Sequence, residues 1–174
     1  MNHLSFSGKM LLSGFSVYLF RISNGTDKFF YVGMTGDNHY PSARSAVHRF
    51  SGHFELQSRS TQNQLGRQLT KKGEAWIANS TIELFHWPID GFKEWKGSYN
   101  EQYKKGLNKE EKAQYEAYKF IQKEVLELEK FVISELSKRL PEERLWNKMI
   151  SSSNGCPKKF EHIAEEIISK VFEH

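Results

Sequence analysis

A carboxylate occurs at a position where a long predicted helix should be apolar. Apolar side chains recur every three or four residues between residues 108 and 140 and define one stripe of a helix. They are Tyr118, Ile121, Val125, Leu128, Val132 and Leu136, with Leu126 and Ile133 widening the stripe. Glu129 falls inside this stripe, whereas Glu124 and Glu127 fall on the opposite side. A carboxylate on an inward face is costly unless it meets a cation, a hydrogen-bond donor or a metal ion. Spacing therefore marks Glu129 as a candidate site residue.

Two further polar residues share one flank of a shorter predicted helix. Ser42 can cap a helix with apolar positions at Ala43, Ala46, Val47 and Phe50, and Gly52 is expected to end it. At about 100° per residue, Arg44 and His48 fall together on one flank and Arg49 on the other. A guanidinium binds anions and an imidazole transfers protons near neutral pH. Arg44 and His48 can therefore serve one site.

Two tyrosines lie near the middle of two predicted strands. Residues 15–22 and 28–35 are rich in β-branched and aromatic side chains, which favour strands. Asn24-Gly25 between them suits a tight reversal, so the two runs are predicted to pair as an antiparallel hairpin. Tyr18 and Tyr31 could then project from one sheet face.

The remaining elements complete an α+β fold around these residues. Residues 62–72 read as a short polar helix and residues 76–87 as a third strand, closed by Pro88. Residues 88–108 have no clear period and are predicted to be an irregular insertion. Asn108 and Glu111 have capping-box spacing, and the long helix that they open is predicted to continue to about Leu140. Residues 157–172 repeat apolar positions at helical spacing and predict a C-terminal amphipathic helix.

Length and composition indicate one folded domain over residues 1–174, with a small antiparallel sheet of about three strands flanked by helices. The chain is 38% hydrophobic and 14% aromatic, which excludes a disordered protein. Its net charge of +4 permits a polyanionic partner without requiring one. The single cysteine, Cys156, excludes a disulfide framework and cysteine-based zinc sites. Residues 1–20 lack a signal peptide or membrane span, so we expect a cytoplasmic protein with no membrane partner.

The order of these residues resembles the GIY-YIG nuclease family. Val17-Tyr18-Leu19 and Tyr31-Val32-Gly33 are similar to the two halves of its motif, although Ser16 replaces a glycine. Arg44 with His48 matches an arginine followed four residues later by a histidine or tyrosine. Glu129, followed by Val132 and Ile133, matches the family's glutamate, and Asn147 matches an asparagine after that helix. The resemblance covers residues 15–147.

The resemblance implies an endonuclease that hydrolyses phosphodiester bonds of nucleic acid, with DNA favoured over RNA. Glu129 would hold a divalent cation, Mg²⁺ or Mn²⁺, with phosphate oxygens and water as the other ligands. Arg44 would donate hydrogen bonds to the phosphate as negative charge develops.

The same resemblance assigns the proton transfers. Tyr18 would accept the proton of the attacking water with the help of a nearby cation, and His48 is the alternative base. Tyr31 would position water or phosphate. Asn147 would orient the residues nearest the reaction or the backbone around them.

Other readings remain open at this point. A catalytically inactive nucleic-acid-binding module, or a structural protein that binds a protein partner or a second copy of itself, is compatible with the same pattern. An orientation of Glu129 away from Tyr18 and Tyr31 would favour the inactive module. His39, His53 and His86 lack metal-ligand spacing and are expected in loops or on the surface, with His53 nearest the predicted site.

Overall fold

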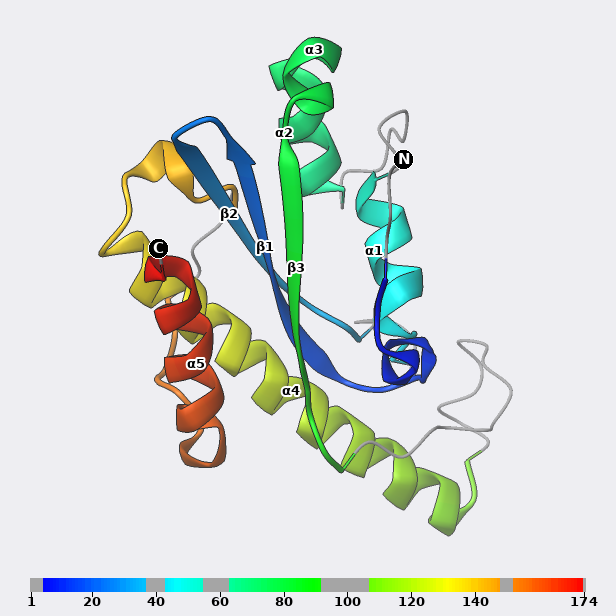
Figure 1. Cartoon of the computed structure of the whole chain (residues 1–174). Helices are drawn as coiled ribbons and strands as arrows, with labels where there is room; N and C mark the ends of the chain where they lie inside the picture. Colours follow the sequence, from blue (N-terminus) through cyan, green and yellow to red (C-terminus); the bar gives the residue numbers. More distant parts are fainter. Residues whose placement is uncertain (1–4, 37–42, 55–62, 92–106, 148–151, 174) are drawn as a thin grey trace.

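A computed structural model describes residues 5–36, 43–54, 63–91, 107–147 and 152–173. At its centre lies an antiparallel sheet of three strands, β1 (Ser16–Asn24), β2 (Asp27–Met34) and β3 (Thr81–Pro88). The strand order is β2-β1-β3, so β1 is central and the other two are edge strands (Figure 1). The predicted α+β class and the three-stranded antiparallel sheet are confirmed.

The β1–β2 hairpin sets which side chains share a face. Gly25 has a φ of 59°, a left-handed conformation that glycine adopts without strain, and it allows Asn24 to pair with Asp27. Tyr18 then lies opposite Gly33. Two residues further on, Phe20 lies opposite Tyr31, so Tyr18 and Tyr31 project from the same face of the sheet.

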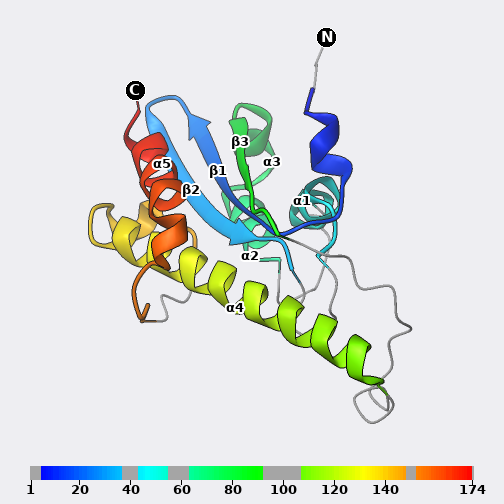
Figure 2. The same ribbon diagram turned by 90° about the horizontal axis from the view of Figure 1, so that it is seen from below.

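Helices cover both faces of the sheet. The face that carries Tyr18, Phe20, Ile22, Phe29 and Tyr31, here called the tyrosine face, packs against α1 (Ala46–Phe54), α2 (Gln64–Lys72) and α3 (Glu74–Ala78). The opposite face carries Val17, Leu19, Phe30 and Val32 and packs against α4 (Lys109–Ser137) and α5 (Glu161–Phe172). Viewed from below, α5 and α1 lie on opposite sides of the sheet (Figure 2).

The two C-terminal helices form where the periodicity predicts them. Asn108 accepts a hydrogen bond from the N–H of Glu111, whose carboxylate accepts one from the N–H of Asn108, so the capping box at the start of α4 is present. The N–H groups of Arg139 and Leu140 both bond to the carbonyl of Leu136 and close the last turn. Short 3₁₀ turns, η3 (Glu142–Arg144) and η4 (Lys158–Phe160), connect α4 to α5.

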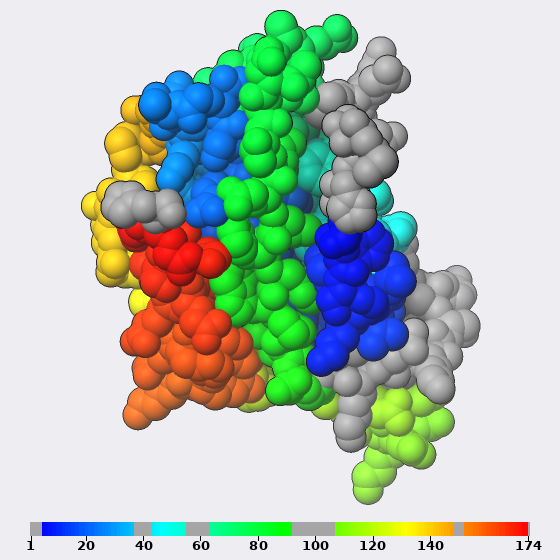
Figure 3. All heavy atoms as spheres, in the orientation of Figure 1, coloured from blue at the N-terminus to red at the C-terminus, as the bar shows by residue number. Residues whose placement is uncertain are grey.

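The third strand is shorter than predicted, because α3 takes the residues that were expected to begin it. Trp76 and Ile77 favour strands by type, yet both lie in α3 and pack on the tyrosine face. The side chains of Asn79 and Ser80 donate to α3 carbonyl groups at 2.8 and 2.7 Å and end the helix. The strand therefore begins at Thr81. It remains visible along the surface between α5 and the N-terminal segment (Figure 3).

The first helix also differs from its predicted bounds. α1 begins at Ala46, where the hydroxyl of Ser45 accepts a hydrogen bond from the N–H of His48 at 3.3 Å, and it continues through Gly52 to Phe54. Ser42, the predicted cap, lies outside the described residues, as does most of the predicted insertion, residues 92–106. In the part of the chain that is described, no helix has the length and apolar character needed to cross a membrane.

Candidate active site

Tyr18 lies at the centre of the tyrosine face and is fully buried. Its hydroxyl group is 2.6 Å from Nε2 of His53, so the neutral imidazole can accept the hydroxyl proton. The positive charge of Arg49 acts on both groups. Tyr18 and His53 therefore form a hydrogen-bonded pair in the electrostatic field of Arg49.

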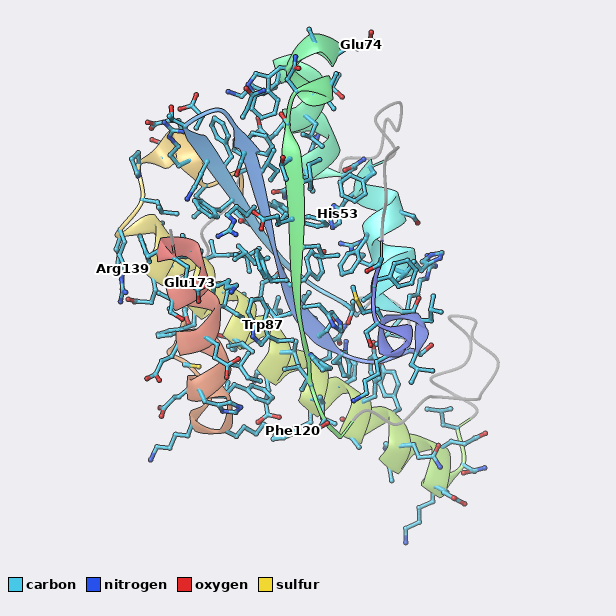
Figure 4. The ribbon with its side chains drawn as sticks, in the orientation of Figure 1. His53, Glu74, Trp87, Phe120, Arg139 and Glu173 are labelled. Atoms are coloured by element: carbon cyan, nitrogen blue, oxygen red, sulfur yellow. The ribbon has the colours of Figure 1, made fainter. Side chains whose placement is uncertain are left out.

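Helix α1 places Arg49 and His53 because they are four residues apart and therefore on neighbouring turns of one face. The buried stripe of α1 consists of Ala46, Phe50 and His53. The ring of Phe50 packs edge-on against Tyr18 at a centroid distance of 4.9 Å and fixes the helix on the sheet. The His53 side chain lies between α1 and the sheet (Figure 4). His53 is thus a core residue, not a surface residue as the sequence predicted.

Burial sets the protonation states of Tyr18 and His53. The pKa of His53 falls to about 4, because burial and then the charge of Arg49 disfavour the imidazolium. Burial, followed by the neighbouring Tyr31, raises the pKa of Tyr18 far above its usual value. Both groups are therefore neutral at pH 7.

Tyr31, on the edge strand β2, lies close to His53. Its ring centroid is 5.2 Å from that of His53, and only 6% of the residue is exposed. Burial and then the nearby charge of Glu129 raise its pKa to about 12. Tyr31 is therefore a neutral phenol rather than a phenolate at neutral pH.

Glu129 acts on the same site from α4, which packs against β2. Burial of the carboxyl group raises its pKa to about 7, against the opposing charge of Arg49. The backbone of Met34, near the end of β2, also lowers the pKa of this carboxyl group. Glu129 in turn raises the pKa of both Tyr18 and Tyr31. The charge of Glu129 therefore acts on both tyrosines, as the sequence interpretation requires of a shared site.

Arg49 is the cation that these groups share. Burial disfavours its charge, but its interactions with Tyr18, Tyr31 and Glu129 outweigh that cost and raise its pKa. We call Tyr18, Tyr31, Arg49, His53 and Glu129 the Arg49 cluster. It combines one cation, one carboxyl group that titrates near neutrality, two phenols and one neutral imidazole.

Two polar atoms of the cluster are buried without a hydrogen-bond partner among the described residues, namely Nε of Arg49 and Nδ1 of His53. Buried polar atoms of native proteins are nearly always paired. One unpaired group belongs to the cation and the other to the imidazole, so a bound ligand with acceptor oxygens would satisfy both. Such unmet capacity is typical of a site that binds substrate.

Asn147 supports the strand that carries Tyr31. Its side-chain amide donates to the carbonyl of Val32 at 2.8 Å and accepts from the N–H of Val32 at 3.0 Å. The neighbouring N–H of Trp146 donates to the carbonyl of Phe30 at 2.8 Å. These bonds pair the outward-facing backbone groups of Val32 and the carbonyl of Phe30, so Asn147 acts on the backbone of the strand that carries Tyr31.

Arg44 and His48 lie apart from the Arg49 cluster. Both are exposed, and Nη1 of Arg44 donates to Nε2 of His48 at 3.0 Å. Within the described residues, no contact joins either one to Tyr18, Tyr31 or Glu129. Since α1 begins only at Ala46, Arg44 precedes the helix, and the inward positions are those of Arg49 and His53.

Both pairs have a spacing of four residues, so spacing could not distinguish them. The apolar phase of Ala46 and Phe50 was the signal that could have identified His53.

Comparisons of the chain with protein-family models, with curated proteins and with solved structures gave no match. The geometry and electrostatics of the Arg49 cluster are therefore the basis for assigning a function.

Proposed function

We propose that this protein is a metal-dependent endonuclease of the GIY-YIG type that hydrolyses phosphodiester bonds in nucleic acid, with DNA as the favoured substrate. The Arg49 cluster carries this proposal. Two strand tyrosines, an arginine with a histidine four residues later, and a glutamate on the long helix are the side chains that the resemblance requires, and they lie in one electrostatic network. The lone Cys156 suits a reducing, cytoplasmic setting.

In the proposed reaction, a water oxygen attacks phosphorus, one phosphorus–oxygen ester bond breaks, and the leaving oxygen receives a proton. Tyr18 accepts the water proton as it passes its own hydroxyl proton to Nε2 of His53, which lies 2.6 Å away. His53 binds protons weakly because burial, and then the charge of Arg49, lower its pKa. A bound phosphate would offset that charge and make His53 a stronger base. His48, the alternative base expected from sequence, is not part of this Tyr18–His53 pair.

Arg49 takes the role first expected of Arg44. Its charge already acts on Tyr18, and its buried Nε has no hydrogen-bond partner among the described residues. It can therefore bind the phosphate while charge develops on the equatorial oxygens. Tyr31 stands beside it to position water or phosphate.

Glu129 fits a hard divalent cation, Mg²⁺ or Mn²⁺. Its carboxyl group has a pKa of about 7, so the anionic ligand becomes available near neutral pH. No group of three or more His, Cys, Asp and Glu residues converges in the described part of the chain. Substrate oxygens and water must therefore complete the coordination. When bound, such a cation would neutralise charge on the phosphate and assist the leaving oxygen.

A plasmid-nicking assay with Mg²⁺ tests the proposal. Wild type is expected to nick or linearise the plasmid, and Glu129→Ala to lose this activity while still binding DNA. Glu116→Ala, an exposed position on the same helix, is the matched control and should cleave like wild type. Equal cleavage by wild type and Glu129→Ala would count against the nuclease.

An inactive nucleic-acid-binding module is the second candidate. Tyr18 and His53 are 0% and 2% exposed, so their hydrogen bond could serve to satisfy a polar core. Binding of DNA or RNA by wild type, with no metal-dependent cleavage of either, would favour this reading.

A further inference from the structure

Charge is distributed unevenly between the two layers of helices. Neither α1 nor α2 contains a carboxylate, and α2 carries Arg67, Lys71 and Lys72. On the other side of the sheet, acidic residues outnumber basic ones in both α4 and α5. The net charge of +4 therefore understates how positive the α1–α2 layer is.

The cations of this layer are also available to a ligand. Arg44, Lys71 and Lys72 are exposed, and none of them forms a salt bridge with a described residue. Lys72 lies over the rings of Phe29 and Trp76 at 4.3 and 5.3 Å, which orients its ammonium group without neutralising it. We call Arg44, Lys71 and Lys72 the α1–α2 cations.

Several lysines of the opposite layer are neutralised by carboxylates. Lys130 pairs with Glu127 at 3.0 Å, and Lys159 pairs with Glu124 at 2.6 Å. The two layers thus differ in net charge, although Lys109, Lys112 and Lys123 of α4 are also exposed and form no salt bridge with a described residue. A net positive layer is the footprint of a polyanionic partner.

The α1–α2 layer is also the one that contains the candidate active site. Helix α1 supplies Arg49 and His53 to the cluster, and α2 packs against α1. Each of these nine-residue helices is about 13 Å long, roughly four base-pair steps of duplex DNA. Arg44 precedes α1, and Lys71 and Lys72 lie in the last turn of α2, so all three belong to the layer that contains the Arg49 cluster.

We propose that the phosphodiester backbone of a nucleic acid lies along α1 and α2 and contacts Arg44, Lys71 and Lys72 while one phosphate enters the Arg49 cluster. This inference rests on the proposed nuclease function. A small anion is disfavoured because these cations lie on two separate segments, the residues before α1 and the last turn of α2. Anionic vesicles are the alternative partner in the test, because α1 exposes Phe54 although α2 exposes no large apolar side chain.

The salt dependence of binding tests this surface without any need for catalysis. The affinity of a fluorescein-labelled DNA duplex, and of an RNA duplex of the same sequence, is measured by anisotropy in EDTA over a KCl titration. The test variant is Arg44→Gln/Lys71→Gln/Lys72→Gln. The matched control, Lys109→Gln/Lys112→Gln/Lys123→Gln, removes the same charge from exposed positions of α4. Circular dichroism and thermal melting confirm that each variant is folded.

Loss of three phosphate contacts should reduce the slope of log K against log salt by about 2.7 for a DNA duplex. The α4 triple should leave that slope unchanged, and the comparison of DNA with RNA identifies which backbone is preferred. Equal effects of the two triples, or binding to anionic vesicles with no binding to either duplex, would overturn the proposal. Absence of cleavage by wild type would instead remove the nuclease and leave the binding comparison standing.

Discussion

The ring of Tyr18 lies directly against Gly33 on the neighbouring strand. A Cβ at position 33 would overlap this ring, coming within 2.6 Å of Cε2. Gly33 has ordinary strand geometry, so its role is steric and not conformational. The glycine that ends Tyr31-Val32-Gly33 therefore provides the space in which Tyr18 lies beside Arg49 and His53.

Gly33→Ala should destabilise the protein by about 1–3 kcal/mol, because the added methyl group overpacks a buried aromatic ring. Gly52→Ala is the control, since nothing lies within 4 Å of its Cβ position and it sits inside α1. That change should stabilise the helix by up to about 1 kcal/mol. Urea unfolding of both variants checks the prediction, and equal stabilities would show that the Tyr18 ring can move away.

His53 should make the protein sensitive to acid. Its pKa is about 4 in the folded protein and 6.5 in an unfolded chain, so the unfolded state binds more protons between these values. Stability from this group is complete above pH 6.5 and is lost as the pH falls toward 4, by up to about 3 kcal/mol. The free energy of unfolding of His53→Gln should depend less on pH in this window. An identical pH dependence in wild type and variant would contradict the assignment.

Several elements could be predicted because a single period governs each of them. The hairpin, α4 and α5 follow from strand propensity and apolar repeats, so Tyr18, Tyr31 and Glu129 were identified on their correct faces. The choice between the Arg44–His48 pair and the Arg49–His53 pair did not follow from spacing, because both pairs are four residues apart. The apolar phase of Ala46 and Phe50 points to His53, and its contact with Tyr18 depends on tertiary packing. The partner of Asn147 depends on tertiary contact with the β2 edge, which no local pattern reveals.

Replacement of the two arginines should separate the sequence interpretation from the structural one. Arg49→Lys should reduce the cleavage rate by on the order of 10²–10³, because a lysine lacks the planar fork that binds both Tyr18 and a phosphate. Arg44→Lys keeps the charge of an exposed residue and should leave kcat near wild type. Steady-state kinetics on a plasmid substrate measure both. A loss of kcat confined to Arg44→Lys would return the catalytic role to the Arg44–His48 pair.

Cleavage should switch on as Glu129 loses its proton. The group has a pKa of about 7, so a metal-binding carboxylate is scarce one pH unit below that value and abundant one unit above it. The folded pKa exceeds the ordinary 4.5, so in metal-free protein this group lowers stability as pH rises from 4.5 to about 7. Mg²⁺ or Mn²⁺ should therefore raise Tm more at pH 8 than at pH 6. Glu129→Gln should abolish that difference, and its persistence would place the metal elsewhere.

Asn147→Ala should loosen the strand that carries Tyr31. The change removes two hydrogen bonds to Val32 and leaves both backbone groups of this residue unpaired at the β2 edge, at a cost of about 2 kcal/mol. Amide hydrogen exchange at Val32 should speed up, because its N–H loses its acceptor. Asn147→Asp retains an acceptor for that N–H and faces the Val32 carbonyl with a negative charge, so it should protect the amide yet still destabilise the protein. If both variants left exchange at Val32 unchanged, the edge of β2 would be held by the Trp146–Phe30 bond alone, and Asn147 would have to act on the substrate instead.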